Sequence, residues 1–430
     1  MKKLFLAFFA MCVFSVVCLG SAAGVEATGG FPAVISDNDR VLWEYPGLAS
    51  TYENCVVTES KEGVYRAYSV FNAGDNYFVV DFAPLFSLPR NSGTFLRFED
   101  YLAGDKEFLR EPDAGFGLIY ARIINGNSYG AGISFGANND EYIIEDASNT
   151  ITGIKRSIGH WNFRALLSLS DPEKNFDLTI GAALPRYYAE ETAYLLPDVN
   201  SIAASQKETF DALDVFLKLR KEIGDLYFNV DFKITSTHGT NRVTAYDGGW
   251  PTEIVKDELF YDISIKGDVL AGKIVKINDR LNCGGVLGFG FETQDKPAVD
   301  DEILDPEEKT AFRYQRAERG MLYVPVYICA EYRINDNVKI SAGAGRNIFA
   351  ILYNNRDSME SVDGYETNRS SWQSFISGYG GISLGTGLSL KAGNLEIELA
   401  LNADALRDGP EFISGKPGNL ASNLAVSFTW

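Results

Sequence analysis

The sequence predicts an all-β fold: an antiparallel transmembrane β-barrel of about fourteen strands, preceded by an N-terminal plug segment. Three observations favour it: an export signal at the start, strand-like segments joined by alternately long and short connections, and a last segment that ends on an aromatic residue. In residues 420–430, large apolar side chains alternate with small or polar ones, as at Leu424, Val426 and Phe428. A strand places alternate side chains on opposite faces, so this segment has one apolar and one polar face.

The first residues have the composition of an export signal. Lys2 and Lys3 supply the positive end, residues 4–19 are an apolar run with Ser15 as its one polar residue, and Ser21-Ala22-Ala23 offers small residues for cleavage. We therefore expect residues 1–23 to be a signal peptide.

The composition after the signal excludes several classes of protein. No later apolar run is long enough for a spanning helix, although barrel strands alternate and escape such a search. A net charge of -19 and a pI near 4.6 argue against nucleic-acid binding, which needs a basic face. The mature chain holds Cys55, Cys283 and Cys329, an odd and widely spaced set that predicts neither a disulfide framework nor a metal site. We expect no cofactor.

From Asn76 onward, strand-like segments are joined by connections that alternate in length. Six short connections are clusters of Asn, Asp, Gly and Pro, which favour turns: residues 125–127, 171–174, 222–224, 278–280, 335–337 and 392–394. Seven long connections cover residues 85–114, 138–157, 186–208, 237–256, 294–319, 352–371 and 406–418. Outer-membrane barrels have an even number of strands, short turns on the side of both chain ends and long loops on the other side. The alternation predicts fourteen strands within residues 76–430.

The predicted strands have one apolar face and one polar face. In residues 225–235, Leu226, Phe228 and Val230 lie on one face, and Asn229 and Asp231 on the other. Carboxylates at alternate positions are intolerable against lipid but ordinary in a water-filled lumen. The predicted lumen-facing charges are Asp177, Asp214, Lys218, Asp231, Lys233, Glu331, Arg333, Glu396 and Glu398. The alternative is a large soluble sheet with one solvated face.

Two segments depart from this pattern. Residues 115–122 do not assign cleanly to faces. Residues 64–71 look strand-like, but one extra spanning strand would place the N-terminus on the outer side, so we assign them to the N-terminal segment. That segment, residues 24–75, is apolar and irregular and needs burial. The lumen of a fourteen-strand barrel is wide enough to hold it, so we expect residues 24–75 to form a plug inside residues 76–430.

This layout resembles the long-chain fatty-acid transporter family (FadL type), whose members have a signal peptide, an N-terminal hatch and fourteen strands. The hatch of that family carries an Asn-Pro-Ala-Leu motif after an acidic, Asn-containing stretch. Here Tyr45-Pro46-Gly47-Leu48 follows Asp37-Asn38-Asp39, and it matches the motif at the Pro and the Leu. The resemblance implies that an apolar ligand enters from outside, binds in the lumen and leaves sideways where the third strand kinks inward.

The third strand by this count is residues 128–136, with Gly130, Gly132 and Gly136 on its inner face. Glycine inside a strand weakens pairing and permits a bulge or kink, which fits a lateral gate. The alternative is that glycines on the inner face make room for the plug.

Signals of catalysis are poor. The chain has two histidines, His160 and His238. Ser236 is near His238, but two residues apart on one strand is not the geometry of a catalytic triad. We expect that the protein is not an enzyme.

The predicted function is passage of hydrophobic small molecules across the outer membrane. One alternative is a general diffusion porin, which the lumen charges would suit. Another is a non-transport barrel that serves as a scaffold for protein secretion or for display of its loops. The expected partners are outer-membrane lipid and lipopolysaccharide, an apolar small-molecule ligand, and the barrel assembly machinery, through the C-terminal strand that ends at Trp430.

Overall fold

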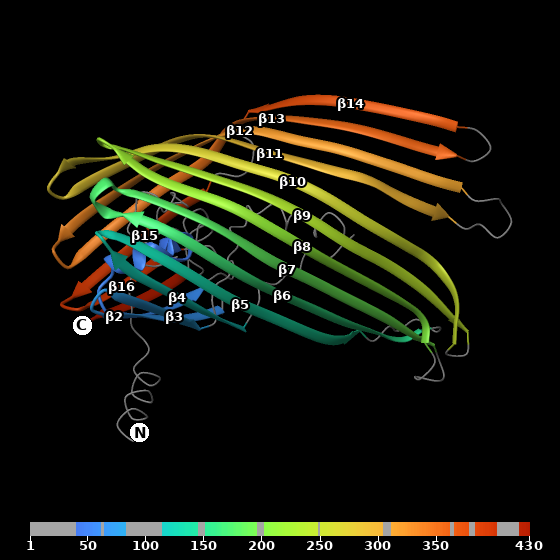
Figure 1. Ribbon diagram of the computed structural model, residues 1–430, viewed down its shortest axis with the longest axis horizontal. Coiled ribbons are helices and arrows are strands. Elements are labelled where there is room, and N and C mark those ends of the chain that lie inside the picture. The colour runs from blue at the N-terminus through green and yellow to red at the C-terminus, as the bar shows by residue number, and fades with distance from the viewer. Residues whose placement is uncertain are drawn as a thin grey trace, which may run out of the picture.

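The computed structural model describes residues 40–61, 64–82, 114–144, 151–195, 202–247, 250–303, 311–361, 365–377, 383–401 and 421–430. The predicted signal peptide lies outside these residues. The described chain forms a closed antiparallel β-barrel (Figure 1). Strands that follow one another in the chain pair antiparallel, except for β14 and β15, and β1 pairs with both β2 and β17, which closes the barrel.

The strands are β1 (Cys55–Lys61), β2 (Val64–Ala73), β3 (Asn76–Phe82), β4 (Ala114–Ile124), β5 (Asn127–Ile144), β6 (Ile151–Asp171), β7 (Phe176–Leu195), β8 (Ile202–Ile223), β9 (Leu226–Asp247), β10 (Trp250–Asn278), β11 (Leu281–Ile303), β12 (Ala311–Asn335), β13 (Val338–Ser361), β14 (Tyr365–Ser377), β15 (Ser383–Ala392), β16 (Leu395–Leu401) and β17 (Ala421–Thr429). Both β14 and β15 pair with β13, β14 along Phe349–Ser361 and β15 along Val338–Gly345. They therefore share one position in the wall, and the barrel has 16 strands.

The predicted count of fourteen was wrong because β1 and β2 had been assigned to the plug. Residues 64–71 lie in β2, which pairs with β1 and β3. The parity argument against this strand fails because residues 55–61 supply a second extra strand, so the total stays even. The wall begins at Cys55, well inside the predicted plug of residues 24–75.

The short turns lie together at one end of the barrel. All six predicted turns join neighbouring strands, and Gly74–Asp75 between β2 and β3 is a seventh. Several turn residues adopt the left-handed region, including Gly74 (φ 69°), Asn125 (φ 52°) and Gly126 (φ 82°), which explains their residue types. The backbone N–H of Trp430 donates to the Asn54 carbonyl (3.1 Å), so both ends of the wall meet here.

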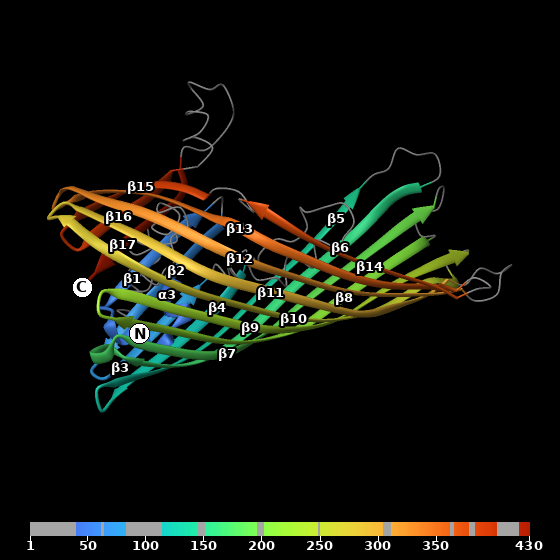
Figure 2. The same ribbon diagram turned by 90° about the horizontal axis from the view of Figure 1, so that it is seen from above.

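Toward the opposite end, the strands are much longer than a membrane requires. Strands β6 to β13 have 20–29 residues, whereas a tilted spanning strand needs about 9–11. Most of five predicted long loops is therefore strand: residues 138–157, 186–208, 237–256, 294–319 and 352–371. Figures 1 and 2 show the long strands running far beyond the short strands β1–β4 and β15–β17.

A short segment before β1 packs inside the barrel at the turn end. It consists of α3 (Arg40–Glu44) and the 3-10 helix η1 (Pro46–Thr51), and we call residues 40–51 the inner segment. Pro46 begins η1, where its missing N–H costs nothing. Within the described residues, no helix is both long and apolar enough to cross a membrane.

The hydrophobic core lies between the inner segment and the inward-facing residues of β1–β4. Its buried members are Leu42, Tyr45, Leu48, Ala49, Cys55, Val57, Tyr68, Val70, Tyr77, Val79, Ile119 and Ala121. Burial of this much apolar surface fixes the inner segment against one side of the wall.

Candidate functional site

The outer face of the barrel is apolar. Large hydrophobic side chains stand exposed on strands all around the wall, among them Phe78, Phe116, Ile133, Leu167, Ile180, Val215, Val269, Phe289, Ile328, Leu384 and Phe428. Water-soluble monomers do not expose apolar surface on this scale. A closed barrel with an outward apolar band has the properties of a transmembrane barrel, so the functional site is sought in the lumen.

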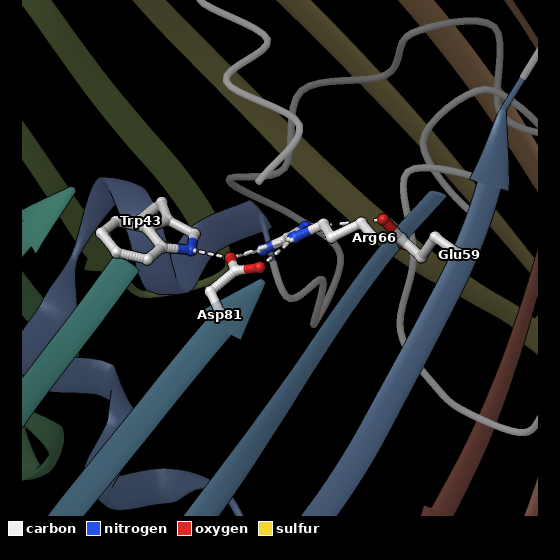
Figure 3. Close-up of polar contacts among 4 residues, drawn as sticks. All are labelled: Trp43, Glu59, Arg66 and Asp81. Carbon is white, nitrogen blue, oxygen red and sulfur yellow. Dashed lines mark hydrogen bonds and ion pairs between the residues drawn. The ribbon is translucent and has the colours of Figure 1, made fainter. Parts of the chain in front are cut away.

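A buried polar network ties the inner segment to strands β1–β3 (Figure 3). The Trp43 indole Nε1 donates to Asp81 Oδ2 (2.7 Å), and Arg66 Nη2 donates to the same oxygen (2.7 Å). Arg66 Nη1 also reaches Glu59 Oε2 (3.4 Å). Glu59, Arg66 and Asp81 are 2%, 7% and 0% exposed. Because Asp81 accepts from both the wall and the inner segment, it couples the two.

The backbone of Gly47 is held by serine hydroxyls of β5 and β6. The Gly47 N–H donates to Ser168 Oγ (2.5 Å), and Ser128 Oγ donates to the Gly47 carbonyl (2.7 Å). A Cβ added at Gly47 would lie 2.7 Å from Ser170 Oγ, so the site admits only glycine without movement.

The predicted gate glycines lie on the buried inner face of β5. A Cβ at Gly130 would lie 2.3 Å from the Gly47 nitrogen and 2.4 Å from the Pro46 carbonyl carbon. At Gly132 the nearest atoms, 3.4 Å away, include Pro46 Cγ. Gly130 therefore makes room for the inner segment, which is the alternative that the sequence left open.

The predicted kink at this strand is not what the structure shows. β5 pairs with β4 from Ala114↔Ala137 to Ile124↔Asn127, and with β6 from Ser128↔Ser170 to Ile144↔Ile154, without a register shift. The glycine-bearing stretch, Gly130 to Gly136, is thus continuously paired on both sides. The strand is also the fifth of the wall, because β1 and β2 precede it.

The inner segment also contacts the charged side of the lumen. The Tyr45 hydroxyl donates to Asn229 Oδ1 (2.9 Å), and the Arg220 guanidinium lies 5.5 Å from the Tyr45 ring centroid. Lys218 Nζ lies 3.7 Å from Glu44 Oε1. With Pro46, Gly47 and Leu48 also buried, all four residues of the predicted plug motif contact the wall or the core.

The predicted lumen charges on β7–β9 are brought together as ion pairs between neighbouring strands. Three pairs lie at 2.7 Å: Arg220–Asp177, Lys218–Asp231 and Lys233–Asp214. On the far side, Lys339 pairs with Glu331 (3.3 Å), Ser389 donates to Glu396 (2.7 Å), Glu398 is half-buried and Arg333 is exposed near a turn. The charges on β7–β9 therefore compensate one another.

Sequence reasoning missed the network of Trp43, Glu59, Arg66 and Asp81. A signal was present: Arg66, Tyr68 and Val70 alternate on one face of a strand-like segment. In the structure Glu59 of β1 faces Arg66, and Asp81 of β3 faces Tyr68, the next residue on that face. This pattern did not predict the network, because the sequence analysis assigns residues 55–73 to the plug and not to the wall.

The residues considered for catalysis lie apart from the lumen site. Ser236 and His238 are both exposed on the outer face of β9, and the side chain of His160 lies outside the described set. Among the described residues, no group of three or more His, Cys, Asp or Glu side chains is placed to hold a metal ion.

Comparisons with known proteins give distant likenesses. No protein-family model matches the chain, and no curated protein matches its sequence. Among solved structures, the Ralstonia pickettii toluene transporter TbuX is 13% identical with a TM-score of 0.36, covering 96% of this chain and 97% of that chain. The Pseudomonas putida toluene transporter TodX is 12% identical with a TM-score of 0.34, covering 87% and 90%. The ferric yersiniabactin uptake receptor FyuA of Yersinia pestis is 9% identical with a TM-score of 0.36, covering 81% and 67%. At these values none of the three identifies a family for this chain.

Proposed function

We propose that this protein is an outer-membrane barrel that passes hydrophobic small molecules, and that the inner segment is its plug. The observation that carries the proposal is the fixed packing of residues 40–51 inside a closed, externally apolar barrel. A segment anchored to β1–β4 by apolar burial and to β5, β6, β8 and β9 by polar contacts narrows the lumen at the turn end. Water and ions must pass along the narrowed lumen, whereas an apolar solute can leave sideways through the wall. Such a barrel therefore restricts the passage of water and ions more strongly than the passage of an apolar solute.

The charge pairing on β7–β9 supports a restricted lumen over an open one. Asp177, Asp214 and Lys218 are at most 9% exposed, so they do not line a freely hydrated channel. Ions gain little from walls whose charges are already neutralised by neighbours.

The test is planar-bilayer conductance of the mature protein beside a variant that lacks residues 24–51. The deletion stops before β1, because residues 55–73 form two wall strands. We expect a silent intact protein and a conducting deletion variant. Gly285→Ala is the control for handling, because a Cβ there meets nothing within 4 Å. Heat-modifiable migration on gels checks that each variant is folded.

Solute transfer then separates the transport alternatives. The proposal predicts that cells producing the intact protein take up a fluorescent long-chain fatty acid faster than cells without it. It also predicts that liposomes carrying the protein do not swell in a small sugar. A steady open current with sugar-driven swelling would contradict the proposal and favour a general diffusion porin.

The strand length favours a second role, in which the barrel presents its extended sheet outside the membrane. β10 alone has 29 residues, roughly three times a spanning strand. This display function predicts a protein partner that co-purifies with the intact barrel and is lost when the ends of β10 to β13 are shortened. Unchanged co-purification after shortening would argue against it.

A further inference from the structure

The barrel wall is interrupted at Pro325, in the middle of β12. The pairs between β11 and β12 run to Leu287↔Val326 and resume at Gly290↔Tyr323, so Gly288 and Phe289 are not paired with Pro325 and Val324. Proline has no backbone N–H to donate to a ladder and is found in sheets at edges or bulges. Here it lies in the interior of the wall.

We call the line of backbone pairing between two neighbouring strands a seam. The seam of β12 with β13, on the other side of Pro325, is interrupted at the same level. The register of β12 with β13 shifts between Val324 and Pro325, since Val324 pairs with Phe349 and Pro325 with Asn347. Ile348 is the extra residue of this bulge. The partner of β13 also changes here, from β15 at Gly345 to β14 at Phe349.

A second proline provides a comparison within the same barrel. Pro185 in β7 interrupts only the seam with β8, where pairing passes from Ala183↔Asp214 to Arg186↔Asp211. The seam of β7 with β6 is continuous there and includes the pair Asn162↔Pro185. Two aligned interruptions, one on each side of the same residue, therefore distinguish Pro325 from Pro185.

The outer face around the interruption carries exposed apolar side chains, with the exposed Arg346 of β13 at its edge. Leu287, Phe289 and Ile348 are 58%, 50% and 45% exposed on the outer face. Unpaired backbone groups cost several kcal/mol each in hydrocarbon, and they are tolerated at membrane depth only where they are covered or line a cavity. Two adjacent weak seams at this depth thus need a reason beyond folding.

The inner side of the interruption is tightly fitted, with apolar side chains over Gly288 and the hydrogen-bonded pair of Tyr323 and Asp268 beside Gly290. A Cβ at Gly288 would lie 2.3 Å from Leu270 Cδ2 and 3.0 Å from Pro325 Cγ, so both side chains close over the Gly288 backbone. The buried Tyr323 ring lies next along the same face and covers Gly290. An apolar solute in the lumen would meet these groups before it met the backbone.

We propose that the wall opens at Pro325, between β11 and β13, and that an apolar solute crosses there between the lumen and the lipid. The inference rests on the proposed function and gives its route through the wall. Separation at this point breaks fewer ladder hydrogen bonds than separation along the continuously paired β5, because residues next to Pro325 lack partners in β11 and the pairing with β13 is bulged. The continuous pairing of β5 makes the glycine-bearing strand the poorer place to open.

Crosslinking tests the route directly. Phe289→Cys with Val324→Cys would join β11 to β12 at facing positions, in a background whose native cysteines are replaced by serine. The matched control is Leu184→Cys with Leu213→Cys, which joins facing positions beside Pro185. Facing residues in neighbouring strands lie close enough for a disulfide. Oxidation of the first pair should reduce uptake of a fluorescent fatty acid to the level of cells without the protein, reversibly with reductant. Oxidation of the control pair should leave uptake unchanged.

Undiminished uptake with the first pair oxidised, or equal loss with the control, would overturn the proposal. Hydrogen exchange supplies a readout that is independent of the solute. The Gly288 and Phe289 amides should exchange faster than those of Thr179–Ala183, and Pro325→Ala, which restores an N–H, should slow them. Pro185→Ala should not. If the protein carries no fatty acid, the proposed function fails, while this exchange pattern still supports an opening. Slow hydrogen exchange at Gly288 and Phe289 in the intact protein would contradict the proposed opening at Pro325.

Discussion

At the scale of residues, the attachment of the inner segment depends on a few shared atoms. Asp81 Oδ2 accepts from both Trp43 and Arg66, each at 2.7 Å, in a site with almost no solvent exposure. A buried carboxylate is stable only with such partners, and a buried guanidinium needs the carboxylate in return. The two interactions therefore differ in weight, since one neutralises a charge and the other adds a single hydrogen bond.

Asp81→Asn should destabilise the folded barrel more than Trp43→Phe does. The first removes the carboxylate charge that lies 2.7 Å from Arg66 and leaves Glu59, at 3.4 Å, as its remaining ion-pair partner, and breaking a buried pair costs about 3–5 kcal/mol. The second removes one hydrogen bond, which contributes about 1 kcal/mol. Free energies of unfolding from urea titrations in detergent micelles measure both. Equal losses in the two variants would show that Asp81 serves the inner segment alone.

Gly130→Ala should displace the inner segment, because the new methyl group meets backbone atoms of residues 46 and 47 at 2.3–2.4 Å. Overpacking of this kind costs about 1–3 kcal/mol. Gly132→Ala is the matched control on the same face, since its nearest neighbours lie at an ordinary 3.4 Å. We expect single-channel current from the first variant and none from the second. Silence in both, with unchanged stability, would contradict the packing described above.

At the scale of elements, β10, β11 and β12 are linked by a side chain that crosses the middle strand. The Tyr323 ring of β12 lies over Gly290 of β11, and its hydroxyl donates to Asp268 Oδ1 of β10 (2.5 Å). Gly290 is required there, because a Cβ would lie 2.3 Å from the ring. The link lies beside the interrupted seam and holds β12 where its own ladder is weak.

Tyr323→Phe should loosen β12 without altering the packing over Gly290. The ring stays and the hydrogen bond to Asp268 is lost, for a cost of about 1 kcal/mol or somewhat more because the acceptor is ionisable. Faster hydrogen exchange at Gly288 and Phe289, with no change in β7, is the expected result. Gly290→Ala is the stricter perturbation and should have the larger effect. Unchanged exchange in both variants would show that the link does not restrain the seam.

At the scale of the whole molecule, closure depends on β1, which joins β2 to β17. A barrel leaves no unpaired edge only if every strand has two neighbours, and a membrane tolerates no open edge. Without β1 and β2, strands β3 and β17 would each lose a partner. The N-terminal region therefore supplies both β1 and β2, which complete the wall, and the inner segment that packs inside it.

Deletion of residues 24–75 should abolish the folded barrel, whereas deletion of residues 24–51 should not. The longer deletion removes β1 and β2, and the shorter one removes only residues before the wall. Heat-modifiable migration on gels after refolding distinguishes the two outcomes. A folded, heat-modifiable product from the longer deletion would mean that β3 and β17 can close a barrel of fourteen strands.

Turns and alternating faces were predictable where one face meets lipid and the other meets polar groups. The strand of residues 225–235 follows this rule, and its charges Asp231 and Lys233 face inward as expected. The rule fails in β1–β4, because their inner face packs on the inner segment and is apolar too, as at Val57, Val70 and Ile119. That is why residues 115–122 resisted assignment, whereas residues 64–71 were placed in the plug by the argument that the strand count is even.

The sequence by itself determined the antiparallel barrel, its turn end and the inward direction of its charges, because these depend on local turn chemistry and a period of two. Only the tertiary structure decided how many strands close the wall, how far they extend and which residues hold the inner segment. Those features depend on contacts between residues far apart in the chain, such as Trp43 with Asp81 and Gly47 with Ser168. The residue pattern within one strand does not predict which residues of the neighbouring strands it pairs with. The weak pairing at Pro325 is therefore a property of the tertiary structure, since it depends on β11 and β13.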